Sequence, residues 1–151
     1  MRVVADTSVI VAAVVSSEPR HDECFRLLTD ATHAFVTPHV ATETYYLLAA
    51  AGYPQAASDF LADIANGFYE LAHLDAADYA MAHDLIGRYE GALRRKKPKP
   101  GSLDLADAMN VIAAAKKETT LIATLDQDYR AVKPLNGPSY FTLLPDDGDS
   151  R

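Results

Sequence analysis

The segment GSLDLADAMNVIAAAKK, residues 101–117, predicts a helix that is apolar on nearly every side and yet carries carboxylates. Its aliphatic side chains reach all sides of a helix with 3.6 residues per turn, which is typical of a buried helix. Asp104, Asp107 and Asn110 interrupt this pattern at a spacing of three, so they share one side. A buried carboxylate needs a partner, and the helix interior holds no lysine or arginine. A bound cation would provide that partner.

The two acids of this helix differ in how well capping explains them. Ser102 or Asp104 could cap the helix, and acids in a first turn are stabilised by the helix dipole. For Asp104, capping and a functional role explain the sequence equally well. Asp107 lies a full turn deeper if Ser102 is the cap, so capping explains it poorly. We therefore expect Asp107 to have a function.

Length and charge limit the classes of protein that this chain can belong to. The chain has 151 residues, of which 49% are hydrophobic, enough for one domain with a sizeable core. We expect residues 1–145 to form this domain and the polar residues 146–151 to form a C-terminal tail. The net charge of -7 argues against a protein that coats nucleic acid by bulk electrostatics, so any contact with a polyanion must be local.

Cysteine usage and apolar runs predict a soluble protein of a reducing compartment. Cys24 is the single cysteine, which excludes an internal disulfide or a cysteine-based zinc cluster. No run approaches the roughly 20 apolar residues of a membrane span. The apolar run at residues 9–15 is short and follows Asp6 rather than a basic flank, so we do not interpret it as a secretory signal. We expect a cytoplasmic protein without membrane attachment.

Short apolar segments alternate with helical patterns along the chain. We expect strands at residues 2–5, 34–37, 69–74, 120–124 and 140–144, and further helices at 9–15, 21–29, 40–50, 56–65 and 75–89. In the helix at 40–50, Val40, Tyr46 and Leu47 are expected to form the apolar side. The alternation is that of an α/β fold in which a parallel sheet is covered by helices on both faces.

Acidic residues stand where two of the predicted strands end. Asp6 ends the first strand and is followed by Thr7 and Ser8, while Asp126 follows the strand that ends at Thr124. Ligands collect at the carboxyl ends of strands in such sheets, so we favour a site at Asp6 over its alternative role as a helix cap. Glu43 lies near the start of its helix, where a ligand role and stabilisation by the helix dipole explain it equally well.

A basic segment, RRKKPKP at residues 94–100, precedes the acidic helix and concentrates five of the fourteen lysines and arginines. Two prolines keep it extended. It is either a solvated surface loop or a segment that grips phosphates beside the acidic site. The residues in question are Arg94, Arg95, Lys96, Lys97 and Lys99.

Asp6, Glu43, Asp107 and Asp126 together indicate a metal site. Converging carboxylates, without cysteine or a histidine pair in reach, are hard oxygen ligands suited to Mg²⁺ or Mn²⁺. Such ions serve phosphoryl chemistry, because they neutralise a phosphodiester and lower the pKa of a bound water. The pattern therefore favours a phosphodiester-cleaving enzyme.

The chain resembles the PIN-domain ribonucleases, and especially the toxins of the VapC type. The resemblance covers nearly the whole chain and rests on the motifs ADTSVIVA, VATETYYLL, LADAMNVIAAA and IATLDQDY. It implies a metal-dependent endoribonuclease in which Asp6, Asp107 and Asp126 hold the ion and Glu43 completes the acidic set. It also implies that Thr7 or Ser8, and Thr124, are supporting hydroxyls. Asp104 and Asp128 are additional acids beside the matched positions.

The same resemblance implies a three-layer α/β/α fold, a homodimer and inhibition by a small antitoxin of the VapB type. The basic segment is longer than the short connection usual in that family. The main alternative is a PIN-like fold with an inactive site that only binds RNA or protein. A response-regulator receiver fits poorly, because a single Asp6 is followed by hydroxyls and Pro145 follows the last predicted strand where a lysine is expected.

Overall fold

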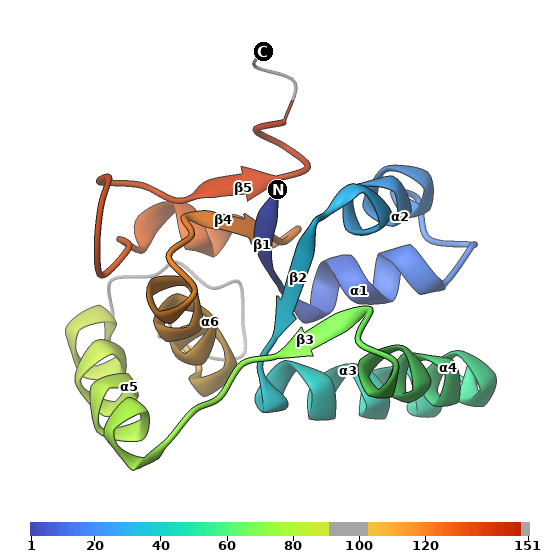
Figure 1. Ribbon diagram of the computed structural model, residues 1–151, viewed down its shortest axis with the longest axis horizontal. Coiled ribbons are helices and arrows are strands. Elements are labelled where there is room, and N and C mark those ends of the chain that lie inside the picture. The colour runs from blue at the N-terminus through green and yellow to red at the C-terminus, as the bar shows by residue number, and fades with distance from the viewer. Residues whose placement is uncertain (91–102, 149–151) are drawn as a thin grey trace.

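A five-stranded parallel sheet organises residues 1–90 and 103–148, the part of the chain that the computed structural model describes. The strand order is β3-β2-β1-β4-β5, and every neighbouring pair is parallel (Figure 1). The strands are β1 (Arg2–Ala5), β2 (His33–Val36), β3 (Tyr69–Leu71), β4 (Leu121–Ala123) and β5 (Thr142–Leu144). The helices are α1 (Thr7–Val14), α2 (His21–Asp30), α3 (Pro38–Ala50), α4 (Pro54–Ala65), α5 (Ala76–Tyr89) and α6 (Leu105–Lys116), with a 3-10 helix η1 (Gln127–Ala131).

Helices cover both faces of the sheet, which confirms the predicted three-layer α/β/α fold (Figure 1). Alternate residues of the central strand β1 enter different cores, as the two-residue period of a strand requires. Val3 and Ala5 pack with α1 to α4, whereas Val4 packs with α5, α6 and η1. Because both faces are covered, the residues of β1 after the exposed Arg2 are all apolar and buried instead of alternating with polar ones.

The structure shifts several predicted boundaries. β3 ends at Leu71, three residues before the predicted end, and its last residue is exposed, as the edge position of this strand allows. α4 begins at Pro54, because the ring of proline already has the backbone angle that a first helical turn needs. α6 begins at Leu105, since Asp104 rather than Ser102 occupies the N-cap position. Residues 91–102, which include Ser102 and the basic segment, lie outside the described residues.

The predicted apolar side of α3 is right at Val40 and wrong at Tyr46 and Leu47. Val40, Thr44 and Leu48 are its buried residues, at the i, i+4, i+8 spacing of a stripe that faces the core. Tyr46 is 69% exposed and Leu47 is 49% exposed. The buried stripe has a threonine at its centre, and much of the rest of the helix is alanine. The large apolar residues of the segment were therefore a poor guide to which side of α3 is buried.

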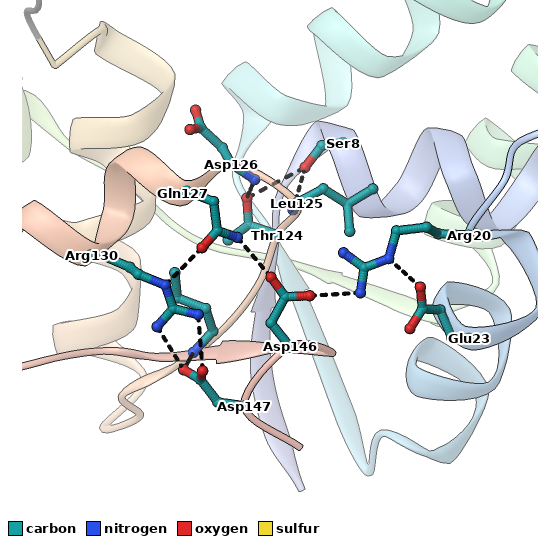
Figure 2. A network of polar contacts seen from close by, with 11 residues as sticks. Ser8, Arg20, Glu23, Thr124, Leu125, Asp126, Gln127, Arg130, Asp146 and Asp147 are labelled. Carbon is teal, nitrogen blue, oxygen red and sulfur yellow. Dashed lines mark hydrogen bonds and ion pairs between the residues drawn. The ribbon is translucent and has the colours of Figure 1, made fainter. Parts of the chain in front are cut away.

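The first residues of the predicted tail are bonded to the sheet and its helices. Asp146 accepts bonds from Arg20 at 2.6 Å and from Gln127 at 2.7 Å, and Asp147 accepts from the backbone N–H of Leu143 at 2.8 Å (Figure 2). Asp146 and Asp147 are thus bonded to the rest of the fold, and the division into a domain at residues 1–145 and a tail at 146–151 stays a prediction. In the described part of the chain, no helix is long and apolar enough to cross a bilayer.

Candidate active site

The predicted acids gather where the central strands end. Asp6 follows β1 and its backbone N–H donates to the Ala123 carbonyl of β4 at 2.9 Å. Thr124 follows β4 and donates in the same way to the Leu144 carbonyl of β5. Because all the strands run in one direction, the residues that follow them lie together at the carboxyl ends of the strands. Asp6 and Thr124 therefore lie side by side at the carboxyl ends of their strands.

Asp6 is a buried carboxylate held by neutral donors. Its side chain is in the N-cap position of α1 but makes no cap hydrogen bond, so the capping explanation fails. Oδ2 accepts from the Ser8 hydroxyl at 2.8 Å and from the Thr124 hydroxyl at 2.9 Å, and Oδ1 accepts from the Asn110 amide at 3.3 Å. Burial raises the pKa of Asp6, the three hydroxyl and backbone bonds lower it, and the negative charge of Asp126 raises it further.

Hydroxyls connect Asp6 to the segment that carries Asp126. The backbone N–H of Leu125 donates to Ser8 Oγ at 3.0 Å, and that of Asp126 donates to Thr124 Oγ1 at 3.0 Å (Figure 2). Asp126 is the N-cap of η1, where its Oδ1 accepts from the backbone N–H of Asp128 at 2.8 Å. Ser8 and Thr124 therefore hydrogen-bond both to the first carboxylate and to the turn that presents the second.

Asp104 and Asp107, at the start of α6, differ in burial and in hydrogen bonding. Asp104 is exposed and caps the helix, since its Oδ1 accepts from the backbone N–H of Asp107 at 2.9 Å. Asp107 is only 7% exposed, and its Oδ1 accepts from the hydroxyl of the buried Tyr129 at 3.1 Å. Capping thus explains Asp104, and Asp107 is the acid that the helix brings toward Asp6.

Asn110 and Tyr129 belong to the site although the sequence prediction did not include them among its residues. Asn110 is fully buried and donates through Nδ2 to Asp6 and, at 2.9 Å, to the Tyr129 hydroxyl. Its Oδ1 accepts from the Thr37 hydroxyl at 3.4 Å. Burial, and then the charges of Asp6 and Asp107, hold the pKa of Tyr129 well above its usual range, so its hydroxyl stays a donor. The signal for Asn110 was its place on the acidic side of a buried helix.

Glu43 reaches the site through Thr7. The Thr7 hydroxyl, one residue after Asp6, donates to Glu43 Oε2 at 3.0 Å. α3 has no acid in its first turn because the helix already begins at Pro38, so the helix dipole does not account for Glu43. Thr7 and Ser8 therefore have separate roles, one holding Glu43 and the other holding Asp6.

The donor chemistry of this site fits a hard divalent cation. Asp6 is buried with a raised pKa, its bonding partners Ser8, Thr124 and Asn110 are neutral, and a cation would favour its charged form. Within the described residues, no group of three or more histidines, cysteines, aspartates and glutamates is arranged to hold a metal ion.

Comparison with known proteins shows the family of this chain. The sequence profile of the PIN domain matches residues 3–134. The chain is 32% identical over 146 residues to Ribonuclease VapC26 of Mycobacterium tuberculosis (strain ATCC 25618 / H37Rv), a match that covers 94% of this chain and 99% of that protein. The chain therefore belongs to the PIN-domain family, and within that family to its VapC type.

A solved structure agrees with this fold. The crystal structure of Mycobacterium tuberculosis VapC20, a toxin that cleaves the sarcin-ricin loop, matches with a TM-score of 0.70 and 22% sequence identity. The match covers 83% of this chain and 91% of that one. At this identity the likeness concerns the fold, and it extends to most of the three-layer architecture.

Proposed function

We propose that this protein is a metal-dependent endoribonuclease that acts as the toxin of a type II toxin–antitoxin pair. The observation that carries the proposal is Asp6, a buried carboxylate whose pKa is raised by burial and by Asp126 and whose hydrogen bonds come from neutral groups. A carboxylate in this state favours a cation. The relatives named above, one of them called a ribonuclease, support RNA as the substrate.

Each residue of the site has a proposed role. Asp6, Asp107 and Asp126 would hold Mg²⁺ or Mn²⁺, which when bound neutralises the phosphodiester and lowers the pKa of a bound water. Ser8 and Thr124 orient Asp6 through its Oδ2 and hold the backbone that presents Asp126. Thr7 orients Glu43 through Oε2, so that this carboxylate can accept a proton from the attacking water.

Other parts of the proposal follow from the family rather than from the contacts of the site. We propose RNA as the substrate, a VapB-like protein as the antitoxin, a homodimer as the assembly and the cytoplasm as the location. Asp104 and Asp128 are proposed to support the site from outside the metal shell: Asp104 caps α6, and the backbone of Asp128 bonds to Asp126. Arg94, Arg95, Lys96, Lys97 and Lys99 are proposed to contact RNA phosphates.

The experiment is incubation with total RNA and Mg²⁺ or Mn²⁺, followed by mapping of the new ends. Cleavage should require the metal, and the Asp6→Asn and Asp126→Asn variants should lose it while retaining the circular dichroism spectrum of the wild type. Cleavage that persists in EDTA, or in both variants, would refute the proposal. Binding of RNA without any cleavage would support the alternative of an inactive binding module.

A further inference from the structure

An aromatic groove adjoins the candidate active site. It has a volume of about 680 Å³ and lies between α3, α5 and α6, lined among others by His39, Glu43, Tyr46, Tyr79, Asp104 and Leu105. This volume is within the range of about 300–1,000 Å³ that small-molecule sites occupy. Glu43 and Asp104 line the groove, and they also contact Thr7 and Asp107 of the acidic region described above.

The spacing of residues on α3 explains why the groove follows this helix. His39, Glu43 and Tyr46 stand at i, i+4 and i+7, which places them on one side. This side lies beside the buried stripe of Val40, Thr44 and Leu48, so that His39 is half-buried while Glu43 and Tyr46 are exposed. Tyr46, 69% exposed, therefore presents its ring beside the groove instead of packing into the protein.

The opposite wall holds a second ring in a fixed position. The Tyr79 hydroxyl on α5 and the His39 Nε2 on α3 are 2.9 Å apart, and the two rings are tilted at 58° with centroids 5.5 Å apart. Burial lowers the pKa of His39, so its imidazole is neutral near pH 7. The groove thus offers aromatic faces and a hydrogen-bonding hydroxyl, and no positive charge from this pair.

The lining of the groove suits an uncharged base. The described residues that line it include no lysine or arginine, and they do include the rings of Tyr46 and Tyr79. An uncharged nucleobase can stack on tyrosine rings, which bind any base because every base has a π face. A protein segment is the other occupant of aromatic grooves, and RNA binding that is unchanged without the Tyr46 ring would favour it.

We propose that this groove binds a nucleobase of the RNA next to the cleaved phosphodiester, with Tyr46 and Tyr79 as the stacking residues. The inference rests on the proposed ribonuclease function and assigns to it a subsite that reads a base. Tyr46 is the residue to change, because its exposure means that its removal leaves the core intact. Tyr140 provides a matched control, since it is 70% exposed and lies next to β5, at the other edge of the sheet from β3.

The test measures binding in EDTA, where no cleavage interferes. The probes are a short fluorescent single-stranded RNA of mixed sequence and a ribose-phosphate chain of the same length without bases, both followed by anisotropy. Tyr46→Ala should bind the RNA roughly ten-fold more weakly, a typical loss for one stacked base, and should bind the abasic chain as the wild type does. Tyr46→Phe should keep the affinity, and Tyr140→Ala should change neither probe.

Three results would overturn the inference. RNA binding that is unchanged in Tyr46→Ala, or an equal loss for RNA and the abasic chain, would remove the base from the groove. Dissociation of a homodimer by Tyr46→Ala, measured by sedimentation with RNA affinity unchanged, would assign this face to a second copy of the chain. Cleavage of RNA with metal is measured separately. Loss of the base-binding inference would leave cleavage intact, whereas loss of the ribonuclease proposal would show as an absence of cleavage.

Discussion

Asn110 links the parts of the acidic site that separate elements contribute. Its amide donates to Asp6 after β1 and to Tyr129 in η1, and its carbonyl oxygen accepts from Thr37, the N-cap of α3. Its amide and its carbonyl oxygen therefore both have partners in a fully buried position. Through Tyr129, the same network reaches Asp107 one turn earlier on α6. Asn110 thus positions two carboxylates without itself being charged.

We predict that Asn110→Asp is more harmful than Asn110→Leu at neutral pH. The aspartate would place a further carboxylate beside Asp6, so its pKa would rise and its charged form would destabilise the fold by about 2 kcal/mol or more. Since a raised pKa in the folded state means that the proton stabilises that state, the loss should shrink as the pH falls. Urea unfolding in EDTA at about pH 7 and pH 5 measures both effects.

Asn110→Leu serves as the control in that experiment. It removes the donors to Asp6 and Tyr129 without adding a charge, so its loss of about 1–3 kcal/mol should be nearly independent of pH. If both variants lose the same stability at both pH values, hydrogen bonding alone determines the effect and crowding of carboxylates is not a property of this site.

A residue could be assigned to the site from the sequence when its side chain differs in kind from its neighbours in the chain. Asp6 and Asp107 are carboxylates inside apolar segments, which is visible in the sequence. Tyr129 was not assigned to the site, because a tyrosine three residues after Asp126 reads as an ordinary core residue. Its role depends on a hydrogen bond to Asp107, 22 residues away in the chain, and no local pattern reports such a pairing.

At the scale of elements, the helix α6 was the most predictable. Every residue from Asp107 to Ala114 is buried, as its all-round apolar pattern indicated. α3 was predicted at the right place, and of its predicted inward residues Val40 is buried whereas Tyr46 and Leu47 are exposed, because propensity locates a helix and only packing determines which residues face the core. The exposed Tyr46 that results from this difference is the residue on which the proposed base subsite depends.

An ion pair fastens α5 to α6. Lys116 Nζ donates to Asp78 Oδ2 at 2.6 Å, and the same oxygen accepts from the backbone N–H of Asp75 at 2.8 Å in the capping box of α5. The bond from Lys116 is the main reason why the pKa of Asp78 is lowered from its ordinary value of 3.8. This pair holds α5 against the helix that carries Asp107.

We predict that Asp78→Asn lowers the free energy of unfolding by about 1 kcal/mol at neutral pH, a modest value because Lys116 is 39% exposed and solvent screens the pair. The pKa of Asp78 is lower in the folded state, so its contribution is present above pH 3.8 and is lost as the pH falls through the folded pKa. The difference between variant and wild type should therefore vanish in acid.

Asp84→Asn is the matched control for this prediction. Asp84 lies on the same helix with its side chain 71% exposed, so its replacement should change the free energy of unfolding little at any pH. Chemical denaturation between about pH 3 and pH 7 distinguishes the two variants. A constant difference for Asp78→Asn across this range would mean that the capping box, rather than the charge, is what the variant disturbs.

At the scale of the whole molecule, the alternation of strands and helices predicted a parallel sheet, and the strand order came only from the structure. β1 pairs with β4, with Val4 beside Ile122, although most of the chain separates these two strands. Such a pairing is set by the packing of helices on both faces and not by any local signal. The convergence of Asp6 with Asp126 depends on this order, because β4 must lie beside β1 for Thr124 to reach Asp6.

The charge of the whole protein leads to a prediction about RNA affinity. A net charge of -7 repels RNA, so a local basic segment must offset it if RNA binds. Replacing Arg94, Lys96 and Lys97 by glutamine should weaken binding at low salt and lower the slope of affinity against salt by about 0.7 for each phosphate that is no longer neutralised. Titrations in EDTA over a range of KCl concentrations measure that slope.

The control for that titration changes the net charge equally at another place. Arg26, Arg88 and Lys133 are exposed residues outside the acidic site, so their replacement by glutamine should leave the slope nearly unchanged. If both triple variants change the slope equally, RNA responds to the overall charge of the protein. In that case the basic segment is a solvated loop or a contact with another protein.

The last prediction concerns the stability of the whole protein with and without metal. Asp107 and Asp6 both act on the buried Tyr129, which means that their charges share one region of low exposure. Asp107→Asn removes one of these charges and keeps an oxygen that can accept the Tyr129 bond. We expect this variant to be more stable than the wild type in EDTA by about 1–2 kcal/mol, and Mg²⁺ to reverse the order by binding the wild type more tightly.

Asp104→Asn is the matched control, because asparagine caps a helix about as well as aspartate and Asp104 is exposed. Its thermal melting should follow the wild type both in EDTA and in Mg²⁺. Two outcomes would contradict the assignment of Asp107 as the metal ligand of α6. A lower melting temperature for Asp107→Asn in EDTA would mean that the hydrogen bonds of Asp107 outweigh charge repulsion. A loss of the Mg²⁺ response in Asp104→Asn would mean that Asp104, rather than Asp107, is the metal ligand.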